Sequence, residues 1–272
     1  MAEHNDSPHP TAIRTMFAGV ARRYDLLNHL LSGGLDRRWR RRAADAVACS
    51  SRDRKVAGTY EGRCDACAPI EHPPPLPRRA RTAPRLVIDV CTGTGDLAMT
   101  VLRQWPRCRV VACDFCRPMV ARAREKVCRA GLGPRAAVVE ADALALPLAD
   151  AVADAACCAF GVRNLADEAA GLSEMVRVVR PGGRVVALEF HRPRGRGPLA
   201  ALFGLYFRRI LPRLGGWISG GRHGGYAYLV RSIEAFGPPE RLARAMQQAG
   251  LRDVTVEPLP GGIASLYVGT RG

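Results

Sequence analysis

A glycine turn directly after an apolar run is the first feature of this sequence that could do chemistry. Residues 86–91 are almost entirely apolar, and Thr92-Gly93-Thr94-Gly95 follows them at once. Between a strand and a helix, such a turn lets the backbone approach a ligand, and the amides at the start of the helix face that ligand. The third glycine of the dinucleotide fingerprint is absent. The turn therefore indicates either a site for a ligand other than NAD or FAD, or a tight turn without a ligand.

Acidic residues follow the next two apolar runs. Asp114 ends the run 109–113, and Asp142 with Ala143 follows the run 137–140. A carboxylate at Asp114 could accept hydrogen bonds from both hydroxyls of a ribose, or it could cap the helix that begins near Pro118. At Asp142 and Ala143, a side chain and a backbone amide could meet the edge of an adenine. Together with the glycine turn, these positions predict a nucleoside-bearing cofactor laid across neighbouring strand ends.

Strands that alternate with helices must position these residues. Apolar runs at 86–91, 109–113, 137–140, 153–160 and 184–188 predict strands, and 97–104, 118–130 and 167–179 predict helices. Pro181-Gly182-Gly183 is expected to end the last of these helices. This alternation predicts an α/β fold, a doubly wound and mostly parallel sheet covered on both faces. Segments 254–257 and 264–270 are expected to add a terminal antiparallel pair, which gives seven strands.

Three regions make up the predicted domain organisation. Residues 1–48 are expected to form a helical N-terminal segment of the catalytic domain, and residues 86–272 its cofactor-binding core. Residues 49–85 are rich in proline and arginine and have little periodicity, so we expect a disordered insertion there. Within the core, residues 198–236 do not fit the strand–helix alternation. They are expected to form a lid over the carboxyl edge of the sheet, together with the N-terminal helices.

Composition limits the class of protein and its compartment. The 272 residues suit one sizeable domain, and no run approaches the roughly 20 apolar residues that span a bilayer. The first residues are polar and acidic, unlike a secretory or transit peptide, so we expect a cytoplasmic protein. An excess of 41 Lys and Arg over 25 Asp and Glu gives a net charge of +16. This excess favours anionic partners, or it reflects the biased composition of an Ala/Arg-rich chain.

Ten cysteines raise the question of a metal or disulfide framework. Cys91, Cys113, Cys157 and Cys158 lie in apolar runs, where a free thiol behaves as a small buried hydrophobe. The insertion contains a single pair, Cys64 and Cys67, with His72 nearby, whereas a zinc site needs four ligands. We therefore expect neither a metal site nor structural disulfides.

Beyond these positions, the sequence resembles the ubiquinone/menaquinone biosynthesis C-methyltransferase family of class I S-adenosylmethionine (SAM)-dependent methyltransferases. The most specific part of this resemblance is the run from Tyr24 to Ser32, with Trp39 beyond it. A second part is the segment 177–185, which is followed by Glu189. The segments 160–164, 226–229 and 261–264 add to it. The resemblance implies SAM as the cofactor, with contacts at Thr94, Asp114, Asp142 and Ala143. Gly93, Gly95 and Ala159 complete the expected cofactor site.

A reaction also follows from the resemblance. It implies C-methylation of a prenylated quinol in quinone biosynthesis, with demethylmenaquinol to menaquinol preferred. Methylation of 2-polyprenyl-6-methoxy-1,4-benzoquinol is the alternative within the family, and a sterol or polyketide is an alternative outside it. The positive charge raises an RNA-binding methyltransferase as a further alternative. Against it, the basic residues are dispersed and no RNA-binding module is evident, so we expect no nucleic-acid partner.

Candidate catalytic residues are Arg163, Tyr24 and Asn28, with Asn164 beside them. Arg163 could stabilise a phenolate or position a water molecule, since a guanidinium is too basic to act as the base itself. The alternative role for Arg163 is a structural ion pair, and for Tyr24 a packed aromatic.

A prenylated substrate stays in the membrane, so we expect peripheral membrane association. Residues 199–211, an apolar stretch flanked by arginines, suit a helix on an anionic surface or an ordinary core helix. The sequence leaves a homodimer open. Departures from the family pattern are Cys91, Cys116, His191, the glycine-rich segment 220–225 and the insertion.

Overall fold

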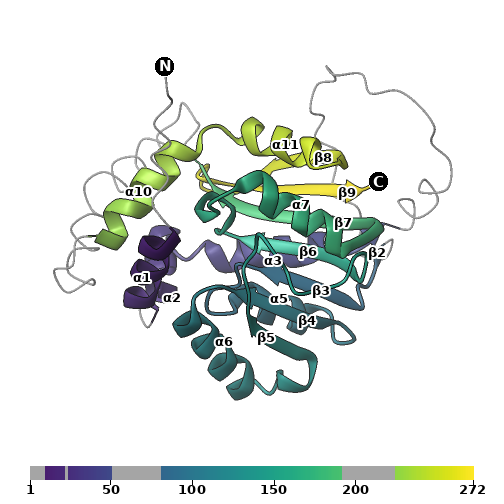
Figure 1. Ribbon diagram of the computed structural model, residues 1–272, viewed down its shortest axis with the longest axis horizontal. Helices are drawn as coiled ribbons and strands as arrows, with labels where there is room; N and C mark the ends of the chain where they lie inside the picture. The colour runs from purple at the N-terminus through teal and green to yellow at the C-terminus, as the bar shows by residue number, and fades with distance from the viewer. Residues whose placement is uncertain (1–9, 22–23, 51–80, 192–223) are drawn as a thin grey trace.

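The computed structural model describes residues 10–21, 24–50, 81–191 and 224–272 (Figure 1). Most of the predicted insertion, with Cys64, Cys67 and His72, lies outside the described residues. So does the predicted lid up to residue 223, which includes the apolar stretch 199–211. At the base of the insertion, β1 (Cys49–Ser50) pairs antiparallel with β2 (Arg81–Thr82). This short ladder brings the two ends of the insertion together.

A seven-stranded sheet forms the centre of the molecule, in the order β5-β4-β3-β6-β7-β9-β8. Its strands are β3 (Leu86–Val90), β4 (Arg109–Asp114), β5 (Ala136–Glu140), β6 (Ala153–Ala159), β7 (Val179–Phe190), β8 (Leu251–Pro258) and β9 (Ala264–Arg271). The first five are parallel, whereas β9 is antiparallel to β7 and β8. The predicted mostly parallel sheet with a terminal antiparallel pair is therefore confirmed, and the sheet as a whole is mixed.

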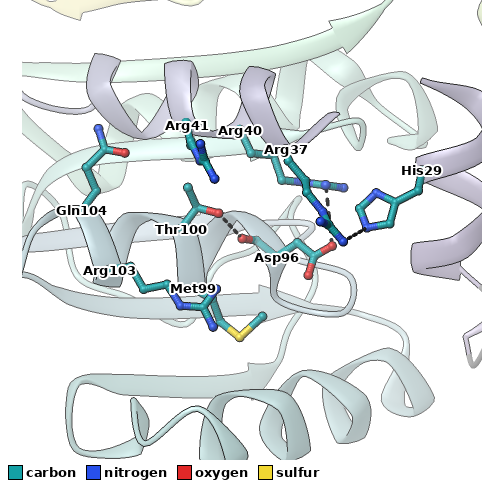
Figure 2. Close-up of a pocket in the computed structure, with 9 residues that line it drawn as sticks. All are labelled: His29, Arg37, Arg40, Arg41, Asp96, Met99, Thr100, Arg103 and Gln104. Carbon is teal, nitrogen blue, oxygen red and sulfur yellow. Dashed lines mark hydrogen bonds and ion pairs between the residues drawn. The ribbon is translucent and has the colours of Figure 1, made fainter. Parts of the chain in front are cut away.

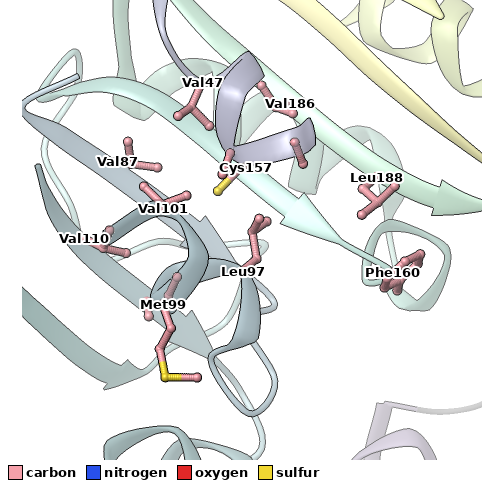
Figure 3. Packing of buried hydrophobic residues seen from close by; sticks show 14 of the residues in the cluster. Val47, Val87, Leu97, Met99, Val101, Val110, Cys157, Phe160, Val186 and Leu188 are labelled. Atoms are coloured by element: carbon pink, nitrogen blue, oxygen red, sulfur yellow. The ribbon is translucent and has the colours of Figure 1, made fainter. Parts of the chain in front are cut away.

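Helices cover both faces of this sheet. Alternation along β7 shows why, because Val186 and Leu188 belong to one buried cluster, and Val185 and Ala187 to the other. The first cluster, shown in part in Figure 3, packs α3 (Asp36–Ala46), α5 (Asp96–Gln104) and α6 (Arg117–Arg129) against the sheet. The second packs α7 (Glu168–Val178) and α11 (Pro239–Gln248).

The expected N-terminal helices are α1 (Pro10–Val20), α2 (Tyr24–Leu31) and α3. Trp39 anchors α3 to the core, since its ring is buried edge-on against Phe160 and Phe190 and its Nε1 donates to the Pro260 carbonyl at 3.1 Å. Helix α1 contacts α6 and also α10 (Gly224–Phe236), the described end of the predicted lid region. Helices α1, α2 and α10 lie at the carboxyl edge of the sheet, whereas α3 packs on its face (Figure 1).

One predicted boundary differs from the structure. The Pro-Gly-Gly turn was expected to separate a helix from the fifth strand, but strand β7 already begins at Val179, which pairs with Ala153. A register shift between Ala153 and Ala155 accommodates the turn within the strand. Gly182 has a φ of +73°, and a Cβ at Gly183 would lie 2.6 Å from the Asp154 carbonyl oxygen, so both positions need glycine.

Candidate active site

A pocket opens where the first strands of the sheet end. The parallel register places Val90 level with Cys113 and Asp114 level with Glu140, so the residues that follow these strands meet at one edge. The chain runs outward from β3 through β4 to β5 and then crosses back to β6, so this edge is a topological switch point. The predicted site residues that line the pocket are Tyr24, Gly93, Asp114, Asp142, Ala143 and Asn164.

The carboxylate of Asp114, which lines this pocket, is held in place by two backbone amides. This carboxylate is buried and accepts the amide of Gly93 at 2.8 Å and the amide of Cys116 at 2.9 Å, one on each oxygen. Burial raises the pKa of Asp114, and the two amide hydrogen bonds oppose that rise. Each carboxylate oxygen keeps a lone pair for another donor. Asp114 can therefore accept ribose hydroxyls while it holds the glycine turn in place.

The glycine turn is shaped by close neighbours on both sides. Gly93 has a φ of +56°, and a Cβ there would lie 3.5 Å from the ring of Tyr24. Gly95 has a φ of +84°, and a Cβ there would lie 3.2 Å from the Cβ of Ala123 on α6. The predicted glycines thus allow Tyr24 to cover the turn and α6 to pack beside it.

Thr94 faces away from the pocket, into a polar network. Its hydroxyl donates to the carboxylate of Asp25, and Lys126 donates to Asp25 at 2.7 Å and to Thr94 at 3.1 Å. Lys126 also pairs with Asp96. Thr94 and Ala159 line a smaller hollow that shares Tyr24 and Gly93 with the main pocket. In this structure the hydrogen bond from Thr94 to Asp25 links the glycine turn to α2. A direct contact between Thr94 and the cofactor stays a prediction.

Tyr24 and Asn28, two of the three predicted catalytic residues, lie one turn apart on α2. Tyr24 is partly buried in the wall of the pocket, whereas Asn28 is buried and is not among the residues that line it. Burial raises the pKa of Tyr24, while the positive charge of Arg163 and the side chain of Asn28 oppose the rise. The amide nitrogen of Asn28 is buried and has no hydrogen-bond partner among the described residues. A role for Asn28 in binding the substrate stays a prediction.

Arg163 lies behind the pocket lining in an ion pair. Its guanidinium pairs with the buried carboxylate of Glu189, donates to the Phe160 carbonyl at 2.7 Å and stands 5.6 Å from the centre of the Phe190 ring. Burial raises the pKa of Glu189, and Arg163 opposes that rise. The structural ion pair, which was the alternative role for Arg163, is therefore present in the fold. Its charge nevertheless reaches Tyr24 and Tyr228, since it lowers the pKa of both against the effect of burial.

Sequence reasoning missed several residues at this site. Tyr228 of α10 donates to the Asn164 side-chain oxygen at 3.0 Å, and Ser232 accepts from Arg163 at 3.4 Å. The apolar lining includes Ile13 and Phe17, together with Phe115, Met119 and Leu144. Ile13 and Phe17 are one helical turn apart, and that spacing was the signal for a common face. Nothing in the sequence distinguished a face that lines a pocket from one that joins the core.

The arrangement fits an adenosine-bearing cofactor. Asp114 offers acceptors for ribose hydroxyls, and the glycine turn leaves room beside them. Asp142 and Ala143 stand with the apolar side chains of Phe115 and Met119 where a flat base could lie. The residues that follow β6, Phe160, Gly161 and Asn164, form the other end of the pocket near Arg163. A small cofactor held across the strands would thus present its reactive end to the residues near Asn164 and Arg163.

Comparisons with known proteins agree with this geometry. Residues 77–271 match the ubiE/COQ5 methyltransferase family. The demethylmenaquinone methyltransferase of Thermus thermophilus is 43% identical over 94% of this chain and 100% of its own length. The ubiquinone/menaquinone biosynthesis C-methyltransferase UbiE of Geobacter sulfurreducens is 38% identical over 96% of this chain and 88% of its own. A solved SAM-dependent methyltransferase from Aquifex aeolicus, 20% identical, shares the fold with a TM-score of 0.51 over 69% of this chain and 82% of its own. The chain belongs to the ubiE/COQ5 methyltransferase family.

Proposed function

We propose that this SAM-dependent methyltransferase methylates a ring carbon of demethylmenaquinol and releases menaquinol. The observation that carries the proposal is the single pocket that joins Asp114, at the cofactor end, to Tyr24 and Asn164, at the end near Arg163. The relatives from Thermus thermophilus and Deinococcus radiodurans, 43% and 42% identical, are both named demethylmenaquinone methyltransferases. Their names favour a naphthoquinol ring as the methyl acceptor.

The chain has to make a ring carbon nucleophilic. SAM supplies an electrophilic methyl group whose leaving group is a neutral thioether. A quinol supplies the electron-rich carbon when one hydroxyl has lost its proton, because the phenolate pushes electron density onto the neighbouring carbon. After the methyl group has bonded, the ring carbon loses its hydrogen as a proton and the ring oxygen becomes a hydroxyl again, so the products are menaquinol, the thioether and one proton. The reduced quinol is therefore the form that is methylated.

Arg163 supports the loss of that proton by its charge. It lowers the pKa of two phenols of the protein, Tyr24 and Tyr228, against the effect of their burial. A quinol hydroxyl placed near them would be acidified in the same way. Glu189 holds the guanidinium in position, and Tyr24 and Asn28 offer polar groups that can orient the ring. Helices α1 and α10 flank the site and help to exclude water.

The role of Arg163 is tested with a neutral pair. Arg163→Ala alone would leave Glu189 buried without its ion partner, which is strongly destabilising. The double variant Arg163→Gln with Glu189→Gln keeps two hydrogen-bonding side chains of similar size. It should bind SAM as tightly as the unmodified chain and have a much lower kcat with a soluble short-chain quinol. A kcat equal to that of the unmodified chain would refute a role for Arg163 in the reaction.

The benzoquinol ring of ubiquinone biosynthesis is the second candidate. It is favoured by the Geobacter sulfurreducens relative, whose name covers both ubiquinone and menaquinone biosynthesis. Mass spectrometry of quinones from cells that lack this protein distinguishes the two. Accumulation of a demethylated naphthoquinone supports the proposal, and accumulation of an unmethylated benzoquinone supports the alternative. A normal quinone profile would contradict both.

The prenyl tail places the substrate in a membrane, so we also propose peripheral association of a cytoplasmic enzyme. Among the helices that the structure describes, none is long and apolar enough to cross a bilayer. Leu26 of α2, close to the site residues Tyr24 and Asn28, is 51% exposed and could enter the lipid surface. Leu26→Asn should reduce sedimentation with vesicles and leave SAM affinity unchanged. A homodimer stays a prediction that analytical ultracentrifugation can test.

A further inference from the structure

A second hollow lies between helices α3 and α5, next to the cofactor site. It has a volume of about 590 Å³, in the range of small-molecule sites. Arg40 and Asp96 line both this hollow and the small hollow beneath the glycine turn. We call it the α3–α5 groove; its described lining is His29, Arg37, Arg40, Arg41, Asp96, Met99, Thr100, Arg103 and Gln104 (Figure 2).

Helical periodicity places the groove residues of α3 on the face that lies toward α5. Arg37 and Arg41 are four residues apart on α3, and Arg103 stands on the facing side of α5. Figure 2 shows Arg37 and Arg41 descending from α3 toward α5, with Arg103 below them. Arg38, between them in sequence, is exposed like Arg37 and Arg41 but does not line the groove. The arginine run therefore places only some of its members here.

Most of the positive charge in the groove is not neutralised. Arg40 pairs with the buried carboxylate of Asp36 and lies 3.6 Å from Asp96. The carboxylate of Asp96, the one acid among the described lining residues, is also held by Lys126. Arg37 donates to His29 Nε2 at 3.3 Å, and His29 in turn is bonded to Asp36 through Nδ1.

Arg41 and Arg103 pair with no acid in the part of the chain that the structure describes. The guanidinium of Arg37 has only a histidine nitrogen as its partner. Three guanidinium groups from two helices thus face a common space without a counter-charge. A guanidinium matches the geometry of a phosphate and can bind it through two parallel hydrogen bonds.

We propose that the α3–α5 groove binds a phosphate group through Arg37, Arg41 and Arg103. Met99 and the aliphatic stems of the arginines offer apolar surface to an organic substituent on the phosphate. A phosphate ester of a membrane lipid and a free phosphate or diphosphate share this chemistry.

The test uses the whole chain and two variants of equal charge. One variant carries Arg37→Gln, Arg41→Gln and Arg103→Gln. The control carries Arg38→Gln, Arg107→Gln and Arg244→Gln, three exposed positions outside the groove. SAM affinity, measured on both, verifies that the fold is retained. It also separates failure of the phosphate site from failure of the proposed methyl transfer.

Two probes distinguish the sources of the phosphate. Inorganic pyrophosphate is titrated by calorimetry, and co-sedimentation is measured with phosphatidylcholine vesicles with and without phosphatidylglycerol. In at least one arm, the groove variant should bind about tenfold more weakly than the control or worse, as expected from lost hydrogen bonds to charged groups. Loss confined to phosphatidylglycerol vesicles identifies a lipid headgroup, and loss of pyrophosphate binding identifies a free phosphate. If the two variants behave alike in both arms, the groove is a solvated basic surface and the proposal is overturned.

Discussion

Replacing Asp114 with asparagine tests the proposed role of its carboxylate in binding the cofactor. Its two oxygens each accept one buried backbone amide, from Gly93 at 2.8 Å and from Cys116 at 2.9 Å. Asparagine has the same shape but only one acceptor oxygen. Whichever way its amide group turns, its NH₂ faces one of the two backbone N–H groups. Ribose hydroxyls would also lose a charged acceptor.

These losses give two separate magnitudes. A buried N–H left without an acceptor costs about 1–3 kcal/mol of folding stability. Loss of a charge-assisted hydrogen bond to ribose costs about 1.5–3 kcal/mol of binding, and each 1.4 kcal/mol is about tenfold in Kd. The Kd for SAM should therefore rise by roughly 10-fold to 150-fold. Because burial raises the pKa of Asp114, SAM affinity of the unmodified chain should also begin to fall at a higher pH on acidification than an exposed aspartate would allow.

Calorimetric titration of SAM and denaturation in urea measure the two effects independently. Asp154→Asn is the control, since Asp154 is also buried; one of its oxygens accepts the backbone amides of Arg85 and Leu86, and the other pairs with Arg180. It stands at the start of β6, at the opposite end of the strand from the pocket. The control should lose stability and keep its SAM affinity. Equal SAM affinity in the Asp114 variant and the unmodified chain would refute the assignment of Asp114 to the cofactor.

Three further substitutions test the frame of the site. Burial raises the pKa of Asp89 from 3.8 to about 7, so the free energy of unfolding should fall as pH rises from 4 to 7, and Asp89→Asn should flatten that slope in urea titrations. Gly161→Ala would place a Cβ 2.5 Å from the Cβ of Cys91 and 2.8 Å from the Sγ of Cys158, and should cost about 1–3 kcal/mol. Adding Cys91→Gly, at a position with a φ of +54°, should restore part of this loss; no recovery would assign the clash to Cys158. Trp39→Phe should lower stability by about 1–3 kcal/mol, because a smaller ring leaves space at a buried site and the bond to the Pro260 carbonyl is lost; an unchanged Tm would contradict this.

The order of strands and helices could be predicted because buried strands appear in the sequence as runs of apolar residues. Strands β3 and β4 are covered on both faces and therefore appear as apolar runs with clear ends. An acid such as Asp114 at the end of such a run stands out for the same reason. The start of β7 could not be placed, since its first pairing, between Val179 and Ala153, precedes the turn that was expected to separate helix from strand.

The orientation of side chains at the site was harder to predict. Thr94 follows a glycine with a φ of +56°, and that backbone geometry, rather than residue type, turns its hydroxyl toward Asp25. Arg163 and Glu189 are 26 residues apart, and β6 and β7 must first pair before the two can meet. Tyr228 reaches Asn164 only because α10 packs on the 3-10 helix at Val162–Asn164. Contacts of this kind depend on tertiary packing and leave no local pattern.

The arginine run of α3 shows why net charge was a poor guide to function. In sequence it is one basic block, and it contributes to a total of +16. Helical geometry divides it: Arg40 is buried against Asp36, and Arg42 reaches Glu257 of β8 with hydrogen bonds of 2.8 and 2.6 Å. Arg37 and Arg41 face the α3–α5 groove and pair with no acid among the described residues. Two variants that remove the same number of charges should therefore differ in anion binding, because what binds an anion is the set of guanidinium groups without a partner and not their total.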